Sequence, residues 1–115
     1  MSWTLRDRDK FQAAHFLRGY QGRCENVHGH TYEVEVAIDV KALDAIGLGV
    51  DFAVVKKTLT DALPDHTLLN DIYEFNPSAE NLARRLFEEL RKSLPVKEVT
   101  VWESEDASAT YSEDL

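Results

Sequence analysis

Three features are scarce in this sequence, and each scarcity excludes a class of protein. There is one cysteine, Cys24, so no internal disulfide can form, which suits a reducing compartment. No apolar run approaches the length that crosses a bilayer, and the first residues lack the apolar core of a signal peptide. Basic residues are also few: 13 Lys and Arg stand against 21 Asp and Glu, for a net charge of −8. We therefore expect a cytoplasmic protein that acts on a small molecule, without a membrane or nucleic acid partner.

The composition is otherwise that of an ordinary globular protein. The chain has 115 residues, of which 43% are hydrophobic and 30% are charged. This length is enough for one hydrophobic core and too short to divide comfortably into two. We predict a single domain over residues 1–115.

Alternating patterns predict two long strands in the first third of the chain. The second strand is the clearer one, from His28 to Val40, because every second residue from Tyr32 onward is apolar. The first strand spans about Trp3 to Leu17, and the glycine-containing segment 18–23 connects the two. An antiparallel pairing would bring the end of the first strand next to the start of the second.

Two helices are predicted in the middle of the chain. Asp51 caps the first helix, which Pro64 ends. The second helix has Asn76 or Ser78 as its cap and ends before Pro95. The apolar stripes of these helices are predicted at Phe52, Val55, Leu59 and Leu63, and at Leu82, Leu86, Leu90 and Leu94.

Two further strands are predicted after the second helix, one over residues 99–103 and one through residues 109–111. The order β-β-α-α-β-β indicates an α+β domain, in which two helices cover one face of an antiparallel four-stranded sheet. The other face is polar along the second strand, at Thr31, Glu33, Glu35 and Asp39. That face is either solvated or lines a space between subunits.

Three histidines are candidate metal ligands. His28 and His30 are two residues apart on one strand and therefore point to the same face, with Gly29 leaving room between them. His15 lies near the end of the neighbouring strand. Three neutral imidazoles are typical of a catalytic zinc site, whose fourth position stays open. The alternative is a structural zinc site that Cys24 closes as the fourth ligand.

Cys24 lies four residues before His28, from where its thiol could reach a metal-bound substrate. A nearby cation and nearby imidazoles lower the pKa of a thiol, and the resulting thiolate acts as a base or a nucleophile. A lone cysteine is more often a small buried hydrophobe, and this alternative stays open.

Two carboxylates complete the set of candidate residues. Asp65 adjoins His66 and could orient its ring for proton transfer, although an Asp after Pro64 also organises turns. Glu103 lies in an apolar strand, where a buried carboxylate needs a partner. It could accept two hydrogen bonds from an amidine-like ring edge such as that of a pterin, or it could lie at a solvated strand end.

These residues stand in motifs that resemble the family of 6-pyruvoyltetrahydropterin synthase and 6-carboxytetrahydropterin synthase, the tunnelling-fold pterin enzymes. The resemblance spans nearly the whole chain. Its motifs are Phe11-Gln12-Ala13-Ala14-His15, Cys24 to His30 with Tyr32, Val50-Asp51-Phe52, Asp65-His66 with Leu69-Asn70, Asn76-Pro77-Ser78-Ala79-Glu80-Asn81 and Val101-Trp102-Glu103. By this resemblance the zinc ligands are His15, His28 and His30, the catalytic base is Cys24, the proton relay is Asp65 with His66, and the pterin anchor is Glu103.

The resemblance also implies a substrate, 7,8-dihydroneopterin triphosphate. The spacing from Cys24 to His28 is similar to that of bacterial 6-carboxy-5,6,7,8-tetrahydropterin synthases of queuosine (7-deazapurine) biosynthesis, zinc-dependent lyases that release acetaldehyde and triphosphate. Glu25, three residues before His28, resembles a branch that forms 6-hydroxymethyl-7,8-dihydropterin for folate. Glu25 is therefore a second candidate catalytic residue, and the chain could be bifunctional. Formation of 6-pyruvoyltetrahydropterin is a further alternative.

Members of this family join sheets from several subunits into a barrel, commonly as two stacked trimers with active sites at the subunit interfaces. The resemblance therefore implies a homotrimer or homohexamer in which Asp65 and His66 serve a neighbour's zinc. The competing class of function is a zinc-stabilised oligomeric binding module that has lost catalysis. Such a module would be free to lose Cys24, Asp65 or His66, so the presence of all three favours an enzyme.

Overall fold

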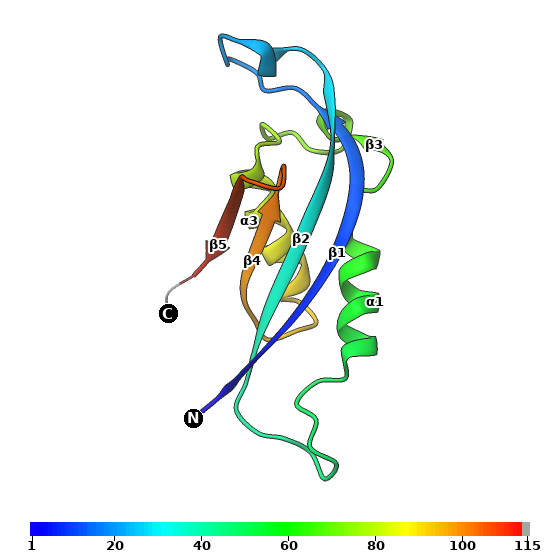
Figure 1. Ribbon diagram of the computed structural model, residues 1–115, viewed down its shortest axis with the longest axis vertical. Helices are drawn as coiled ribbons and strands as arrows, with labels where there is room; N and C mark the ends of the chain where they lie inside the picture. Colours follow the sequence, from blue (N-terminus) through cyan, green and yellow to red (C-terminus); the bar gives the residue numbers. More distant parts are fainter. Residues whose placement is uncertain (114–115) are drawn as a thin grey trace.

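A long antiparallel pair of strands forms the spine of the fold. The computed structural model describes residues 1–113, so the last two residues of the predicted domain lie outside the described part. Strand β1 (Trp3–His15) pairs with β2 (His28–Val40) without interruption along both strands. Figure 1 shows this pair running most of the length of the molecule. The bounds predicted for β2 are confirmed, whereas β1 ends two residues before the predicted Leu17.

The sheet has five strands in the order β3-β1-β2-β4-β5 and is mixed. Strands β4 (Val96–Trp102) and β5 (Ser108–Ser112) extend it in antiparallel fashion beyond β2. On the other edge, β3 (Thr67–Leu68) runs parallel to β1. The prediction of four antiparallel strands is therefore wrong in strand number and in the direction of β3. A two-residue strand is too short to show an alternating pattern, so its pairing is invisible in the sequence.

The two predicted helices are confirmed, and the structure settles how each begins. Helix α1 (Phe52–Ala62) starts after Asp51, whose side chain accepts a hydrogen bond from the Ala53 N–H at 2.8 Å. Helix α3 (Ala79–Leu90) starts after Ser78, which accepts a hydrogen bond from an N–H in the first turn. Ser78, and not Asn76, is therefore the cap of the second predicted helix.

A third helix was not predicted. Helix α2 (Leu69–Ile72) is a single turn that follows β3 directly. One turn is shorter than the period that identifies an amphipathic helix, so the sequence does not indicate it. The described order of strands and α-helices is thus β-β-α-β-α-α-β-β, with a short 3-10 turn (Arg23–Glu25) between β1 and β2.

The hydrophobic core lies between one face of the sheet and the helices α1 and α3. Helix α3 packs on β4 and β5, and α1 packs against β1 and α3 (Figure 1). Phe52 is 52% exposed, so its predicted place in the buried stripe is wrong, because the packing of α1 is made by its later turns, at Val55 and Leu59. The core side chains include Phe11, Tyr32, Val34, Val36, Val55, Leu59, Leu82, Leu86, Leu90, Val99 and Val101.

The opposite face of the sheet carries cross-strand ion pairs. Arg6 contacts Glu35 at 3.2 Å and Glu98 at 3.4 Å, and Arg8 contacts Glu35 at 2.8 Å and Glu33 at 3.5 Å. Both arginines are about half exposed, so each pair contributes little stability. Their effect is to neutralise carboxylates that would otherwise repel one another across neighbouring strands.

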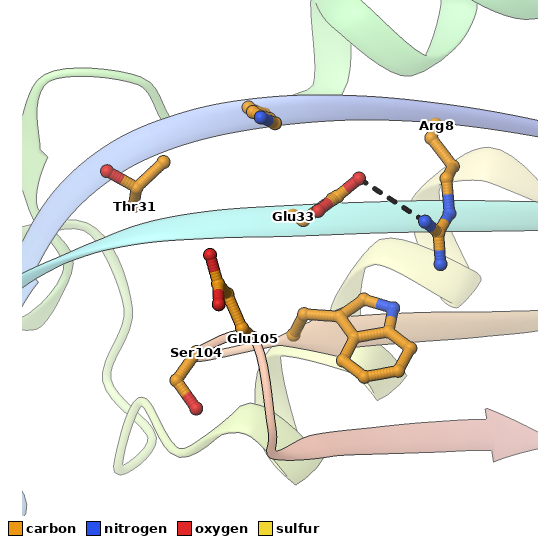
Figure 2. Close-up of a pocket in the computed structure, with 7 residues that line it drawn as sticks. Arg8, Thr31, Glu33, Ser104 and Glu105 are labelled. Atoms are coloured by element: carbon orange, nitrogen blue, oxygen red, sulfur yellow. Dashed lines mark ion pairs between the residues drawn. The ribbon is translucent and has the colours of Figure 1, made fainter.

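A cavity of about 320 Å³ opens on this polar face, away from the three histidines. Figure 2 shows the ion pair between Arg8 and Glu33 at one side of the cavity and Thr31, Ser104 and Glu105 around the rest. Charges of both signs line it, from Arg8, Lys10, Glu33 and Glu105. No helix formed by residues 1–113 is long and apolar enough to cross a membrane.

We expect Leu86→Ala in α3 to lower the free energy of unfolding by about 2–5 kcal/mol, because this side chain is 1% exposed and its loss leaves a cavity. Chemical denaturation measures the change. Leu43→Ala is the matched control, since Leu43 is 41% exposed and its truncation should cost less than about 0.5 kcal/mol. Equal effects of the two substitutions would contradict the core assignment.

Candidate metal centre

Three histidine rings converge where the β1–β2 pair ends. His15 is the last residue of β1 and lies directly opposite His28, the first residue of β2. His30 follows two residues later on the same face of β2. The ring centroids are 4.5 Å apart for His15 and His28, 5.1 Å for His15 and His30, and 4.8 Å for His28 and His30. The structure therefore brings together the three residues predicted to bind a metal.

Two of these rings are oriented by backbone carbonyls. His15 Nδ1 lies 2.7 Å from the Pro77 carbonyl oxygen, and His28 Nδ1 lies 2.7 Å from the Asn26 carbonyl oxygen. A carbonyl only accepts, so in each ring Nδ1 carries a proton, and in the neutral form of the ring Nε2 is the nitrogen that can bind a metal. The two Nε2 atoms face each other at 3.0 Å. Neither sequence pattern nor motif indicated these carbonyl partners, because they belong to the backbone.

The third ring lies beside the predicted pterin anchor. Nε2 of His30 is buried and has no hydrogen-bond partner among residues 1–113, and the nearest acidic atom is Oε1 of Glu103 at 3.6 Å. Burial lowers the pKa of His30 below its usual value, and the neighbouring His15 and His28 lower it further, against the opposing effect of Glu103. His30 is therefore neutral near pH 7 and available as a ligand.

This donor set fits a metal ion. One ligand nitrogen from each of His15, His28 and His30 lies within 4.8 Å of the others. Two nitrogen ligands of a tetrahedral zinc stand about 3.4 Å apart, given Zn–N distances of about 2.0–2.1 Å. Neutral imidazoles suit zinc and several other divalent metals. Among the described residues, Cys24 does not belong to this group of clustered ligand atoms. The structure therefore does not support a closed site with Cys24 as the fourth ligand.

Cys24 and Glu25 lie together in the 3-10 turn of the loop between β1 and β2. The Cys24 side chain is partly buried and Glu25 is exposed. The Cys24 carbonyl accepts a hydrogen bond from the Leu17 N–H at 2.6 Å, which ties the turn to the chain that leaves β1. The turn is continuous with Asn26, whose carbonyl orients His28.

Asp65 and His66 form an exposed pair at the outer edge of β1. Oδ2 of Asp65 lies 2.8 Å from Nδ1 of His66, and Oδ1 accepts a hydrogen bond from the Gln12 N–H at 2.8 Å. That N–H and the His66 ring lower the pKa of the Asp65 carboxyl below its usual value. His66 has a φ of 57°, which is uncommon outside glycine. The pair was predicted as a unit. Neither residue is among the clustered candidate ligands of its own chain, although His66 and His30 line the same surface pocket.

Tyr32 underlies the cluster, although the sequence reasoning gave it no role in the site. Its ring lies edge-on to His15 at 5.8 Å and to His30 at 5.4 Å, and it stacks on Phe11 at 4.8 Å. The hydroxyl is fully buried without a partner in the described part of the chain, and burial raises its pKa, with Glu103 adding to the effect. Its position two residues after His30 on the same strand face was the available signal.

Comparison with known proteins bears on the identity of this site. Relatives include the 6-carboxy-5,6,7,8-tetrahydropterin synthase of Bacillus subtilis, 36% identical over 105 residues that cover 84% of this chain and 71% of that protein. An Archaeoglobus fulgidus protein provisionally given the same name is 41% identical over 99 residues, 84% of each chain. The dihydroneopterin monophosphate aldolase of Pyrococcus furiosus is 33% identical over 105 residues, 86% of this chain and 88% of that one.

The fold comparison agrees with the sequence comparison. The structure of Caenorhabditis elegans 6-pyruvoyl tetrahydropterin synthase superposes with a TM-score of 0.86 at 28% identity, over 99% of this chain and 97% of that one. The model of one family, described as 6-pyruvoyl tetrahydropterin synthase, matches residues 4–114. With this match over nearly its whole length, the chain belongs to the 6-pyruvoyl tetrahydropterin synthase family.

Proposed function

We propose that this protein is a zinc-dependent lyase that converts 7,8-dihydroneopterin triphosphate to 6-carboxy-5,6,7,8-tetrahydropterin, with release of acetaldehyde and triphosphate. Family membership supports a reaction on a pterin side chain. The names of the Bacillus subtilis and Archaeoglobus fulgidus relatives support the carboxy product. We further propose that residues 1–115 form a single domain and that the protein is cytoplasmic, on the composition and charge described above.

The convergence of three imidazoles carries this proposal. His15, His28 and His30 supply three nitrogen ligands, and a zinc with three protein ligands keeps a position open for substrate. Two of the rings are pre-oriented by backbone carbonyls, so little reorganisation is needed when a metal binds. When bound, zinc would act as a Lewis acid that polarises the side-chain oxygens of the substrate.

The chain's own residues divide the remaining work. Cys24 is the proposed base that removes a carbon-bound proton from the substrate side chain. Glu103 is the proposed pterin anchor. Its Oε1 lies 3.6 Å from Nε2 of His30, and it lines a second cavity of about 320 Å³, which is separate from the one in Figure 2. A carboxylate there accepts hydrogen bonds from an amidine-like ring edge and so holds the pterin beside the metal.

Asp65 and His66 are proposed to carry protons in the site of a neighbouring subunit. Three observations support this. The pair is bound to the outer edge of β1 through Gln12, the His66 side chain is 77% exposed, and the pair does not join its own chain's cluster. Only Ala13 and Ala14 of β1 pair with β3, so much of this edge has no strand partner in the described chain. We therefore propose a homotrimer or homohexamer with shared active sites.

A second candidate reaction is cleavage of the side chain to 6-hydroxymethyl-7,8-dihydropterin. Glu25 adjoins Cys24 in the same turn and is exposed, so a second proton acceptor is available at this position. The name of the Pyrococcus furiosus relative, an aldolase that acts on dihydroneopterin monophosphate, is consistent with such chemistry in the family. A bifunctional enzyme would use Cys24 for one product and Glu25 for the other.

The metal assignment is tested by substitution of a ligand. We expect His28→Ala to weaken zinc binding by more than about 100-fold. Removing a group that only hydrogen-bonds to a ligand typically lowers metal affinity by about 10–100-fold, and removing the ligand itself should lower it further. Chelator competition measures the affinity. His66→Ala is the matched control and should bind zinc as the wild type does, since His66 is exposed and lies outside the cluster. Unchanged zinc affinity in His28→Ala would remove the basis of the proposed function.

The two candidate bases are tested by product analysis. Cys24→Ala should abolish the 6-carboxy product and keep one zinc per chain, because Cys24 is not among the three ligands. Glu25→Gln should leave the 6-carboxy product and remove any 6-hydroxymethyl product. Mass spectrometry of the products formed from 7,8-dihydroneopterin triphosphate separates these outcomes. Carboxy product from Cys24→Ala would show that another group is the base.

Shared active sites are tested by mixing inactive subunits. His28→Ala and His66→Ala chains should each be inactive alone, since one lacks a metal ligand and the other the proposed relay. After co-assembly, random mixing places both intact residues at about a quarter of the sites, so about a quarter of the wild-type activity should return. Turnover of the mixture measures this. No recovery, despite mixed oligomers seen by native mass spectrometry, would place His66 in its own subunit's site.

A further inference from the structure

Two asparagine side chains pair with the main chain just beyond the end of β1. Oδ1 of Asn70 accepts a hydrogen bond from the Phe16 N–H at 2.9 Å, and its Nδ2 donates to the Phe16 carbonyl at 3.0 Å. Asn76 repeats this pattern two residues further on, with 2.9 Å from the Arg18 N–H and 3.1 Å to the Arg18 carbonyl. We call these four hydrogen bonds, made by Asn70 and Asn76, the asparagine clamp.

The clamp replaces a neighbouring strand. A side-chain amide offers an acceptor and a donor, as a peptide group does. Each asparagine therefore pairs with both the N–H and the carbonyl of one residue, as the opposite residue of an antiparallel strand would. The main-chain groups of Phe16 and Arg18 thus face the same side, as those of alternate residues in a strand do. Leu17, between them, faces the other side, where its N–H donates to the Cys24 carbonyl at 2.6 Å. Residues 16–18 are therefore held on both sides.

Asn76 also adjoins a residue that orients one of the three clustered histidines. The residue after Asn76 is Pro77, whose carbonyl orients His15 at 2.7 Å. Asn76 is itself fixed, because its carbonyl accepts hydrogen bonds from the Ser78 N–H at 2.8 Å and from Nδ2 of Asn81 at 2.9 Å. Its side chain thus positions the loop that carries Cys24, and its backbone neighbour positions a metal-facing ring.

We propose that Asn70 and Asn76 are positioning residues, which set the place of Cys24 relative to the histidine cluster. The inference rests on the proposed function, in which Cys24 is the base. Without the clamp, residues 16–18 would keep the bond from the Leu17 N–H to the Cys24 carbonyl and a long hydrogen bond of 3.5 Å from Nη1 of Arg18 to the Phe75 carbonyl. No other hydrogen bond among the described residues would then hold this segment, and the loop from 16 to 27 would be free to shift. A displacement of about 1 Å in a reacting group can reduce the rate by about 10²-fold.

The test uses Asn70→Asp and Asn76→Asp in the zinc-loaded full chain. Each substitution keeps the size of the side chain and its acceptor oxygen, but it replaces the Nδ2 donor with an oxygen that faces the carbonyl of Phe16 or Arg18. Gln21→Glu is the matched control. It makes the same amide-to-acid change in the same loop, at an exposed side chain that makes no hydrogen bond within the described residues.

We expect both clamp variants to bind zinc as the wild type does and to lose kcat by about 10–100-fold with little change in KM, the range seen when supporting groups are removed. The rate at which iodoacetamide alkylates Cys24, and the pH at which that rate rises, should change in both variants, because the thiol has moved. A residue that only stabilised the fold would alter neither in the folded variant. Gln21→Glu should match the wild type in all three measurements.

Wild-type kcat together with wild-type alkylation in the folded variants would overturn the proposal, as would a loss of kcat without a change in alkylation. If the wild type does not turn over 7,8-dihydroneopterin triphosphate, the proposed function fails, while alkylation still decides whether the clamp positions Cys24. If the variants do not fold, hydrogen exchange of the wild type tests whether the clamp forms. The amides of Phe16 and Arg18 should then exchange more slowly than those of residues 19–21, and equal exchange would show that the clamp does not form.

Discussion

The register between β1 and β2 is the constraint on which the site depends. His15 and His28 are directly opposite partners only because the pairing runs unbroken from Trp3 and Val40 to the ends of the strands. A slip of one residue would turn the side chains of one strand to the other face of the sheet. Burial of the apolar face of β2 prevents that slip. The hydrophobic core thus determines where the imidazoles stand, although it contains none of the chemistry.

The second requirement is that the imidazole rings turn their Nε2 atoms toward one another. The carbonyls that orient two of the rings come from segments far apart in the chain. The carbonyl that orients His28 comes from Asn26, in the loop just before β2, whereas the one that orients His15 comes from Pro77, just before α3. The capped start of α3 therefore contributes to the candidate metal centre as well as to the core. The packing of this helix and the arrangement of the candidate ligands are coupled, because the connector that begins α3 also presents the carbonyl that orients His15.

The sequence predicted the parts that follow from periodicity and from motifs. The alternation in β2 gave its bounds correctly, and spacing on one strand face correctly placed His28 and His30 together. The short elements were missed, because β3 and α2 contain too few residues to show a period. The exposure of Phe52 was also missed, since helical spacing says which face a residue is on but not how far along the helix a neighbour reaches.

By itself the sequence determined which chemical groups are available: four imidazoles, a thiol, several carboxylates and the strand pattern that brings two of the rings to one face. The sequence also predicted that His15 would approach them, at the end of a neighbouring antiparallel strand. Only the tertiary structure decided the register that sets His15 directly opposite His28, left Cys24 outside the group of candidate ligands, and held Asp65 with His66 on the outer edge of β1. The physical reason is that these relations are made by backbone hydrogen bonds between distant segments. Every residue carries the same backbone donor and acceptor, so the sequence does not show which of them will pair.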